Sequence, residues 1–196
     1  MKILITAGGT KEPIDPVRYI GNSSTGKMGR ALAVVAEDEY KAEVILLDAS
    51  EGSAADLYKR VSAHAESSDI IIMAAAVADY TPIMSSGKKI KKQQQNLNIE
   101  LKPTIDILAE LGKKKKNQFL VGFCLESDHL LEEAQRKLET KNLDMIIANG
   151  VESIGSDQSR AVILTPDQQL DLPQMSKEEL AETILDLIME QTANRK

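Results

Sequence analysis

Five short runs of consecutive apolar residues alternate with stretches in which apolar residues recur at helical spacing. The apolar runs cover residues 3–5, 44–47, 70–73, 119–123 and 145–148. Runs without polar alternation are typical of strands covered on both faces, as in parallel sheets. The helical patterns cover residues 27–37, 53–65, 104–111 and 128–141. This alternation of strands and helices predicts an α/β fold with a doubly wound, mostly parallel sheet.

The C-terminal part of the chain follows a different pattern. Residues 160–172 place two apolar stretches on either side of Pro166 and Asp167, which predicts a hairpin. Ser176 and Glu179 have the spacing of a capping box and begin a final helix. We therefore expect a Rossmann-like sheet that ends in a hairpin and a helix. No repeat or shift of composition divides the chain, so residues 1–196 are expected to form a single domain.

Two long connections interrupt the regular alternation. Residues 8–26 are rich in glycine and proline, and residues 79–98 are rich in lysine and glutamine. Connections of this length inside a compact domain are usually functional or disordered. Both follow the carboxyl ends of predicted parallel strands, where open α/β sheets bind their ligands. We expect a ligand site there.

The first connection carries two glycine motifs. Gly8-Gly9-Thr10 follows the first strand and would let a nucleotide approach the backbone, although a plain turn has the same pattern. Gly21–Met28 nearly matches a P-loop, but Met28 cannot bind Mg²⁺ and the motif lies far from its strand, so we reject that interpretation. What remains is a helix N-terminus that favours an anion, or a helix capped by Ser24 or Thr25.

Lysines are grouped in three places. The run at residues 88–92 lies in the second long connection, where close ammonium groups must face solvent or an anion. The run at residues 113–116 is interpreted as a solvated charge run. Lys137 and Lys141 share one face of a predicted helix, where Glu133 offers Lys137 a surface ion pair.

Charge and cysteine content narrow the possible functions. The net charge of −6 argues against a general nucleic-acid binder, although a cleft can still be locally positive. Cys124, the single cysteine, excludes an internal disulfide and is expected to be buried. His64 and His129 have no metal-ligand spacing. No apolar run is long enough to cross a bilayer, so we expect a cytoplasmic protein with no membrane or nucleic-acid partner.

Several of these segments, taken in order, resemble a single family. Residues 5–18 (ITAGGTKEPIDPVR) and 22–29 (NSSTGKMG) strongly resemble phosphopantothenoylcysteine synthetase, also called phosphopantothenate–cysteine ligase. Further matches lie at residues 75–80, 89–92, 106–108, 121–123, 141–144 and 148–149. In many bacteria this domain follows a flavin-dependent decarboxylase in one chain. Because this chain begins at the first strand of the synthetase, we expect a stand-alone or excised domain.

The resemblance implies a two-step ligase reaction of coenzyme A biosynthesis. The carboxylate of 4′-phosphopantothenate reacts with a nucleoside triphosphate, CTP in most bacterial members, and pyrophosphate leaves. The amino group of L-cysteine then attacks the acyl-nucleotide and releases the nucleoside monophosphate. Because negative charge gathers at the α-phosphate, lysines and Mg²⁺ are expected to stabilise the first step. Family members are dimers whose sites draw on both subunits, so the resemblance implies a homodimer.

The resemblance also implies roles for individual residues. Lys89 would be the lysine of a flap, residues 79–98, that closes on the reacting groups, and Asn22 would hold the acyl-nucleotide. Lys137 and Lys141 would neutralise the triphosphate. The nucleotide-binding set implied in this way is Gly8, Gly9, Thr10, Met73, Ala74, Ala75, Asp79, Lys89, Ile105, Asp106, Ile107, Leu108, Phe123, Lys137 and Lys141. Residues that bind Mg²⁺ are not identified.

Two other functions stay open at this point. An NAD(P)-dependent short-chain-type reductase would share the fold, but none of the four tyrosines has a lysine four residues later. A non-catalytic nucleotide- or RNA-binding module could use the lysine-rich connections, but two phenylalanines and no tryptophan offer few stacking platforms. The stretch of residues 44–69 is shorter than in the usual family pattern. The local pocket wall and part of the dimer contact are therefore expected to differ from those of the family.

Overall fold

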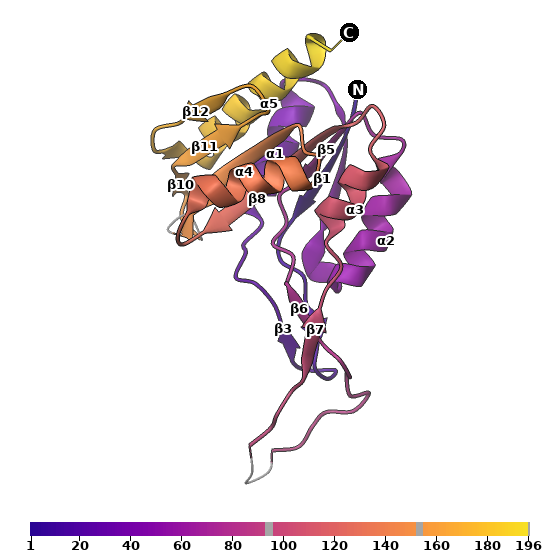
Figure 1. Ribbon diagram of the computed structural model, residues 1–196. Coiled ribbons are helices and arrows are strands. Elements are labelled where there is room, and N and C mark those ends of the chain that lie inside the picture. The colour runs from indigo at the N-terminus through magenta and orange to yellow at the C-terminus, as the bar shows by residue number, and fades with distance from the viewer. Residues whose placement is uncertain (93–95, 152–154, 196) are drawn as a thin grey trace.

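The predicted apolar runs become the strands of one central sheet. The computed structural model describes residues 1–92, 96–151 and 155–195. The sheet comprises β1 (Lys2–Ala7), β4 (Glu43–Asp48), β5 (Ile70–Met73), β8 (Phe119–Glu126), β9 (Met145–Gly150), β11 (Ala161–Leu164) and β12 (Gln169–Asp171). Its order is β12-β11-β9-β8-β5-β1-β4 (Figure 1). Strands β4, β1, β5, β8 and β9 are parallel, while β11 pairs antiparallel with β9 and β12. The predicted mostly parallel sheet and C-terminal hairpin are confirmed.

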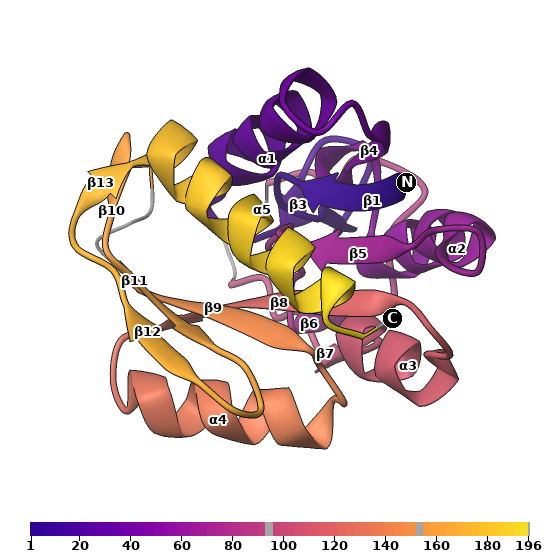
Figure 2. The same cartoon turned by 90° about the horizontal axis from the view of Figure 1, so that it is seen from above.

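Helices cover both faces of this sheet. The helices are α1 (Lys27–Asp38), α2 (Ala54–Ala65), α3 (Ile107–Lys114), α4 (Leu130–Thr140) and α5 (Lys177–Ala193), with a short 3-10 helix η1 (Ala49–Glu51) before α2. Helices α1 and α5 lie on one face, and α2, α3 and α4 on the other (Figure 2). Along β1, Ile3 and Ile5 belong to the core under α1 and α5, whereas Leu4 belongs to the core under the other three helices. Because successive side chains of a strand point to opposite faces, a strand such as β1 contributes residues to both cores.

Three of the α-helices begin directly after a polar residue whose side chain caps the helix. The predicted capping box at Ser176 and Glu179 is confirmed, and Ser53 forms a second one with Asp56. The predicted helix 104–111 begins later, at Ile107, because Asp106 Oδ1 accepts the N–H of Ala109 and so caps the helix. No helix in the described part of the chain is both long and apolar enough to cross a bilayer.

One predicted strand differs in its environment. The run at residues 44–47 is expected to be covered on both faces, but it forms β4 at the edge of the sheet. Leu46 is 41% exposed there, and only Leu47 and Ala49 in this region are fully packed into the core. The end of a sheet has no neighbour to cover the last strand, and an apolar run alone does not reveal that position.

The two long connections form short hairpins instead of plain loops. The first contains β2 (Glu12–Pro13) paired with β3 (Tyr19–Ile20), and the second begins at β6 (Tyr80–Pro82), which pairs with β7 (Leu101–Pro103). Together they form an arm that projects from the body of the molecule (Figure 1). Glu12 anchors the arm because its buried side chain accepts the N–H of Ala54 at the start of α2. A further small pair joins β10 (Gln158–Ser159) to β13 (Met175–Ser176).

Candidate active site

Two segments leave the carboxyl edge of the parallel sheet and are hydrogen-bonded to each other. The oxygen of Gly8 accepts the N–H of Ala76 at 2.8 Å, and the oxygen of Ala76 accepts the N–H of Thr10 at 3.2 Å. Thr10 is buried, and its Oγ1 accepts the N–H of Ala78 at 2.9 Å. The structure therefore brings the predicted Gly8–Thr10 turn beside the predicted residues that follow β5.

Asn22 lies against the same segment. Its Nδ2 donates to the backbone oxygen of Val77 at 3.0 Å. Asn22 is exposed, and its Oδ1 has no partner among the residues that the structure describes. An amide has two donor hydrogens and one acceptor oxygen, so Asn22 can still both donate to and accept from a ligand.

A cavity of about 180 Å³ opens at this edge, next to the N-terminus of α1. It is lined by residues 23–29, 74–76 and 123–125 together with Asn149, Gly155 and Ser159. The residue before α1 is Gly26, with φ of +72°, a conformation that side chains rarely adopt. Gly26 is the N-cap of α1, so neither Ser24 nor Thr25 occupies the capping position, although Thr25 Oγ1 accepts the N–H of Lys27 at 3.4 Å. The end of α1 that faces the cavity is suited to an anion.

Asn149 lines this cavity and carries a buried acceptor without a partner among the described residues. The residue is 8% exposed, and its Nδ2 donates to the oxygen of Arg160 at 3.4 Å. Its buried Oδ1 has no hydrogen-bond partner in the described structure. Buried polar atoms are normally paired, so Asn149 Oδ1 is an exception within the described residues. Sequence reasoning assigned no role to Asn149, although residues 148–149 are among the family matches.

Lys137 turns inward from α4 to the end of β8. Its Nζ lies 2.6 Å from Glu126 Oε1 and 3.4 Å from Cys124 Sγ. Burial lowers the pKa of Lys137, but the hydrogen bond to Glu126 and the neighbouring thiol outweigh it and raise the pKa above its ordinary value. Burial also raises the pKa of the Cys124 thiol, which is buried as predicted. The predicted surface pair with Glu133 is wrong, since Glu133 pairs with Arg136.

Lys141 extends from the end of α4 to the start of α3. Its Nζ lies 2.9 Å from Oδ2 of Asp106, the N-cap of α3. The turn at Lys141 packs directly on α3, because a Cβ at Gly112 would overlap the carbonyl oxygen of Lys141. Asn142 Nδ2 also donates to the oxygen of Gly112 at 3.0 Å. The structure thus confines the backbone of Lys141 and joins it to the predicted residue Asp106.

The other predicted nucleotide-binding residues reach this edge in different ways. Phe123 is half-buried and lines the cavity, whereas Asp79 is exposed just before β6. The side chains of Met73 and Ile107 belong to the core, so only their backbone can face a ligand. Half-buried members of the predicted set also include Ala74, Ala75, Ile105 and Leu108.

Lys89 is the predicted residue that the structure does not bring to this edge. It is exposed on the arm and forms no hydrogen bond or ion pair with any described residue. The arm projects away from α4, which carries Lys137 and is followed directly by Lys141 (Figure 1). The next residue, Ile90, is fixed: its N–H donates to Asp15 Oδ2 at 3.0 Å and its oxygen accepts from Arg18 Nη2 at 2.6 Å. Lys89 therefore directly precedes a residue whose backbone is held by two hydrogen bonds.

Asp15 is the centre of the hydrogen bonds that fix Ile90. Its side chain is fully buried and accepts the N–H groups of Val17 and Arg18 at 2.9 Å each, besides that of Ile90. It also accepts from Arg18 Nε at 3.0 Å and from Nη2. The bonds from the Arg18 guanidinium, aided by the three N–H donors and opposed by desolvation, hold the pKa of Asp15 well below its usual range. Sequence reasoning gave neither residue a role, although both lie in the 5–18 motif.

Comparison with known proteins finds a matching family model and similar relatives. The family model of the DNA/pantothenate metabolism flavoprotein C-terminal domain matches residues 1–192. The coenzyme A biosynthesis bifunctional protein CoaBC of Bacillus subtilis (strain 168) is 45% identical, and the match covers 93% of this chain and 50% of that protein. The chain therefore spans about half the length of this relative.

Solved structures share the whole fold. The C-terminal domain of a coenzyme A biosynthesis bifunctional protein CoaBC is 36% identical with a TM-score of 0.84, and the match covers 98% of this chain and 96% of that one. A Cab2 mutant in complex with phosphopantothenate-cysteine is 17% identical with a TM-score of 0.78, and covers 99% and 88%, a likeness of fold alone. The resemblance predicted from the sequence is confirmed, and the chain belongs to the family of the DNA/pantothenate metabolism flavoprotein C-terminal domain.

Proposed function

We propose that this chain is a phosphopantothenate–cysteine ligase of coenzyme A biosynthesis. In this proposal it joins 4′-phosphopantothenate to L-cysteine through an acyl-nucleotide formed from CTP. The names of its CoaBC relatives support the pathway, and a structure with the same fold, the Cab2 mutant, is a complex with phosphopantothenate-cysteine. A nucleotide must then bind at the carboxyl edge of the sheet, as is general for this type of fold.

The observation that carries the proposal is the set of groups that meet around the cavity. The N-terminus of α1 offers positive charge, Lys137 contacts Cys124 in the cavity wall while paired with Glu126, and Asn149 Oδ1 is a buried acceptor without a described partner. A nucleotide has phosphates for the first two and an exocyclic amino group on cytosine or adenine for the third. The cavity thus suits a negatively charged ligand that also carries a hydrogen-bond donor.

In the first step, a carboxylate oxygen of 4′-phosphopantothenate attacks the α-phosphate and pyrophosphate leaves. Lys137 and Lys141 would neutralise the triphosphate, each exchanging part of its present bond to a carboxylate, Glu126 or Asp106, for a phosphate oxygen. Lys89 would add a cation where the new bond forms. Cations fixed at the position of developing charge lower the barrier without solvent reorganisation.

In the second step, the amino group of cysteine attacks the acyl carbon and the nucleoside monophosphate leaves. Asn22 is the residue that we assign to holding the acyl-nucleotide during this attack. Its Nδ2 is oriented by the oxygen of Val77, and its Oδ1 is open to a donor. A neutral amide can hold a negatively charged intermediate without repelling it.

Mg²⁺ is part of the proposal as a companion of the triphosphate. No group of three or more His, Cys, Asp or Glu side chains that could hold a metal ion lies within the described ranges. Mg²⁺ typically keeps several waters and binds through substrate phosphates with one or two carboxylates. When bound, it would supply charge neutralisation at the phosphates, and we assign no side chain to it.

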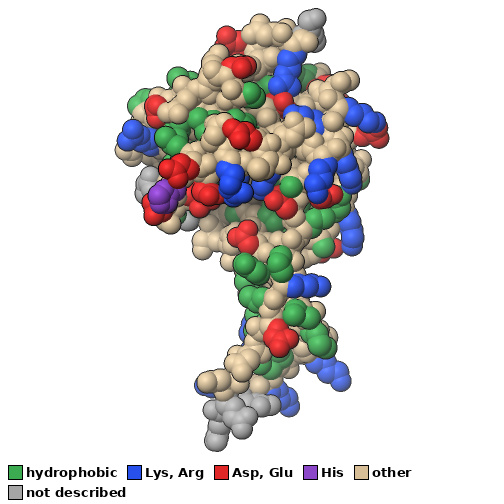
Figure 3. Space-filling view, viewed as in Figure 1, with side chains coloured by type: hydrophobic (Ala, Val, Ile, Leu, Met, Phe, Trp, Pro, Cys, Tyr) green, Lys and Arg blue, Asp and Glu red, His purple; other side chains and the backbone are tan. Residues whose placement is uncertain are grey.

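We also propose that the chain acts as a homodimer whose arms contact a second copy. Large apolar side chains exposed on the arm and its base are Val17, Tyr19, Tyr80, Ile83, Met84, Leu97 and Leu101. Figure 3 shows apolar side chains along the arm below the body. Several large exposed apolar side chains on one projecting segment are typical of an interaction site. A dimer would cover it and would let Lys89 reach a site that draws on both copies.

The experiment that tests the function is pyrophosphate release, measured with CTP or ATP and with 4′-phosphopantothenate present or omitted. We expect release that requires 4′-phosphopantothenate, proceeds without cysteine, and is faster with CTP. Product containing cysteine should form only when cysteine is added. No release with either triphosphate would contradict the ligase, and a clear preference for ATP in kcat/KM would contradict CTP as the substrate.

A further inference from the structure

A second cavity lies between α2 and α3, at the opposite edge of the sheet from the candidate active site. Its volume is about 360 Å³, and its apolar lining includes Ile71, Leu111 and Leu120. Ile71 and Leu120 are the second residues of β5 and β8, so the cavity opens at the amino ends of the strands. This volume is within the usual range for a small-molecule site. The proposed ligase reaction makes no use of it.

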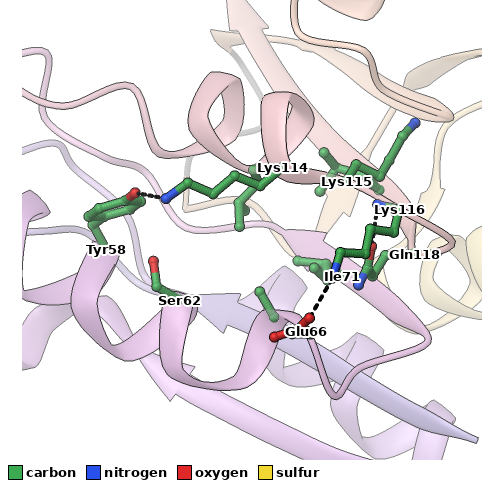
Figure 4. A pocket seen from close by; sticks show the side chains of 11 residues that line it. Tyr58, Ser62, Glu66, Ile71, Lys114, Lys115, Lys116 and Gln118 are labelled. Carbon is green, nitrogen blue, oxygen red and sulfur yellow. Dashed lines mark hydrogen bonds and ion pairs between the residues drawn. The ribbon is translucent and has the colours of Figure 1, made fainter.

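The polar groups around this cavity are mainly hydrogen-bond donors (Figure 4). Lys114 extends from α3 toward α2, where its Nζ donates to the Tyr58 hydroxyl at 2.7 Å and lies 5.3 Å from the centre of that ring. Because this hydroxyl accepts from Lys114, its own hydrogen is available, and so are two hydrogens of the ammonium group. The Ser62 hydroxyl lies near this pair and has no partner among the described residues. A ligand here must therefore accept hydrogen bonds.

The charges around the cavity are compensated except at one lysine. Lys116 Nζ lies 2.6 Å from Glu66, and Lys115 Nζ lies 2.9 Å from Asp144. Lys114 has only the neutral Tyr58 as hydrogen-bond partner within the part of the chain that the structure describes. The sequence interpretation of residues 113–116 as a solvated run misses these contacts, because they come from α2 and from the turn before β9. Lys114 has no ion-pair partner among the described residues, and one such ammonium matches a ligand with a single negative charge.

We propose that this cavity binds a small amphipathic monocarboxylate. Its carboxylate accepts hydrogen bonds from Lys114 Nζ and from the Tyr58 hydroxyl. Its aromatic or branched aliphatic body lies on Ile71, Leu111 and Leu120, where it is removed from water. A carboxylate fits better than a phosphate monoester, because a second negative charge would find no further free cation at this end of the cavity.

The test is a titration of the ¹⁵N-labelled full chain with 4-phenylbutyrate, followed by amide chemical shifts. We expect shifts around residues 58–66 and 111–120 that saturate with one binding constant. The neutral amide 4-phenylbutyramide has nearly the same shape and should bind at least about tenfold more weakly, because it lacks the charge. Lys114→Gln should weaken binding of 4-phenylbutyrate by about tenfold and should leave the amide unaffected.

Lys113→Gln is the matched control, because Lys113 is the adjacent lysine, pairs with Glu110 and does not line the cavity. We expect it to bind 4-phenylbutyrate like the unchanged protein. Equal affinity for the carboxylate and the amide, or equal loss in the two lysine variants, would overturn the proposal. So would shifts at Phe123 and Asn149 in place of the α2 and α3 residues, since the probe would then occupy the candidate active site.

Discussion

At the scale of single residues, Asp15 shows how a buried charge can position a reacting group that it does not touch. The carboxylate accepts the N–H of Ile90, and Lys89 is the preceding residue. Arg18 bonds both to Asp15 and to the oxygen of Ile90, so the backbone of Ile90 has two supports. We expect Asp15 to be a positioning residue whose ionised form is needed to hold the segment around Ile90 against the β2–β3 hairpin within the arm.

The first prediction concerns the pH dependence of stability. The pKa of Asp15 is well below its ordinary value of 3.8 in the folded chain, so its ionised form stabilises the fold at every pH above about 4. Asp15→Asn should lower the urea midpoint of unfolding by a constant amount from pH 5 to pH 8. This difference should shrink as the pH falls below 3.8. Asp167→Asn, at the exposed turn after β11, is the control. A difference that grows in acid would contradict the assignment.

The second prediction separates Lys89 from the general charge of the arm. Lys89→Gln keeps much of the side-chain length and removes the cation that we place at the α-phosphate. A preorganised charge of this kind is worth about 10²–10³ in rate. Pyrophosphate release without cysteine should fall by that factor, while Lys92→Gln serves as the control from the same run. Formation of the acyl-nucleotide at the unchanged rate in Lys89→Gln would exclude this role.

The third prediction concerns Asn22 and the second step. Asn22→Asp puts a carboxylate beside an intermediate that already carries a negative phosphate. The acyl-nucleotide should therefore accumulate even when cysteine is supplied. Its formation should be slowed less than its reaction with cysteine. Quenched-flow mass spectrometry measures both steps, and Ser23→Ala controls for disturbance of the neighbouring loop. If the intermediate never accumulates, Asn22 acts in substrate binding or in the first step.

Residue types could be predicted from the sequence much better than residue partners. Lysines were expected near the carboxyl edge of the sheet, and Lys137 lies at the end of β8. Its partner was predicted to be Glu133, one helical turn away, but Glu126 comes from the end of β8. Asn149 was overlooked because its significance is a missing hydrogen bond. A missing partner becomes visible only when every neighbour in space is known.

At the scale of elements, long patterns were easy to predict and short ones were not. Four of the five apolar runs became strands that are buried on both faces, and the fifth became the edge strand β4, which pairs with β1. The strands of the arm contain only two or three residues each, and most of their side chains are exposed. They are held by pairing and by buried polar contacts such as that of Glu12, which hydrophobic patterns do not report.

The fourth prediction concerns the arm as a substrate for proteolysis. The lysines at residues 88–92 are exposed, and Lys89 has no counter-charge among the described residues. Trypsin should therefore cleave there first. Adding CTP and 4′-phosphopantothenate together should slow this cleavage, because the lysines then face anions and the segment closes. Cleavage after Lys59 in α2 is the internal reference, and equal cleavage with and without the ligands would count against a closing flap.

At the scale of the whole molecule, the arm and the body have opposite characters. The body buries its apolar residues on both faces of the sheet, whereas the arm exposes several of them, with Met84 at 85%. The sequence predicted the body because its core is internal to one chain. The apolar residues of the arm gave no periodic signal, since the surface that would cover them belongs to a second molecule in our proposal.

The fifth prediction concerns the molar mass of the protein in solution. Light scattering coupled to size exclusion should give about twice 21.5 kDa for the chain. Replacing residues 83–100 by a short glycine–serine turn should give a monomer with unchanged helical circular dichroism, because the central sheet lies outside the arm. The shortened protein should release no pyrophosphate. A monomeric mass for the intact chain at micromolar concentration would contradict the dimer.

The contact between α3 and the turn after α4 also limits how this chain can change over time. The helix meets the turn at Gly112, where a side chain would strike the carbonyl of Lys141. Any replacement at position 112 must be accompanied by a different path of the backbone near 141, and neither change is tolerable without the other. Substitutions at these two places are therefore expected to be inherited together. Grafting α3 alone into a related scaffold would fail unless its partner turn were transferred with it.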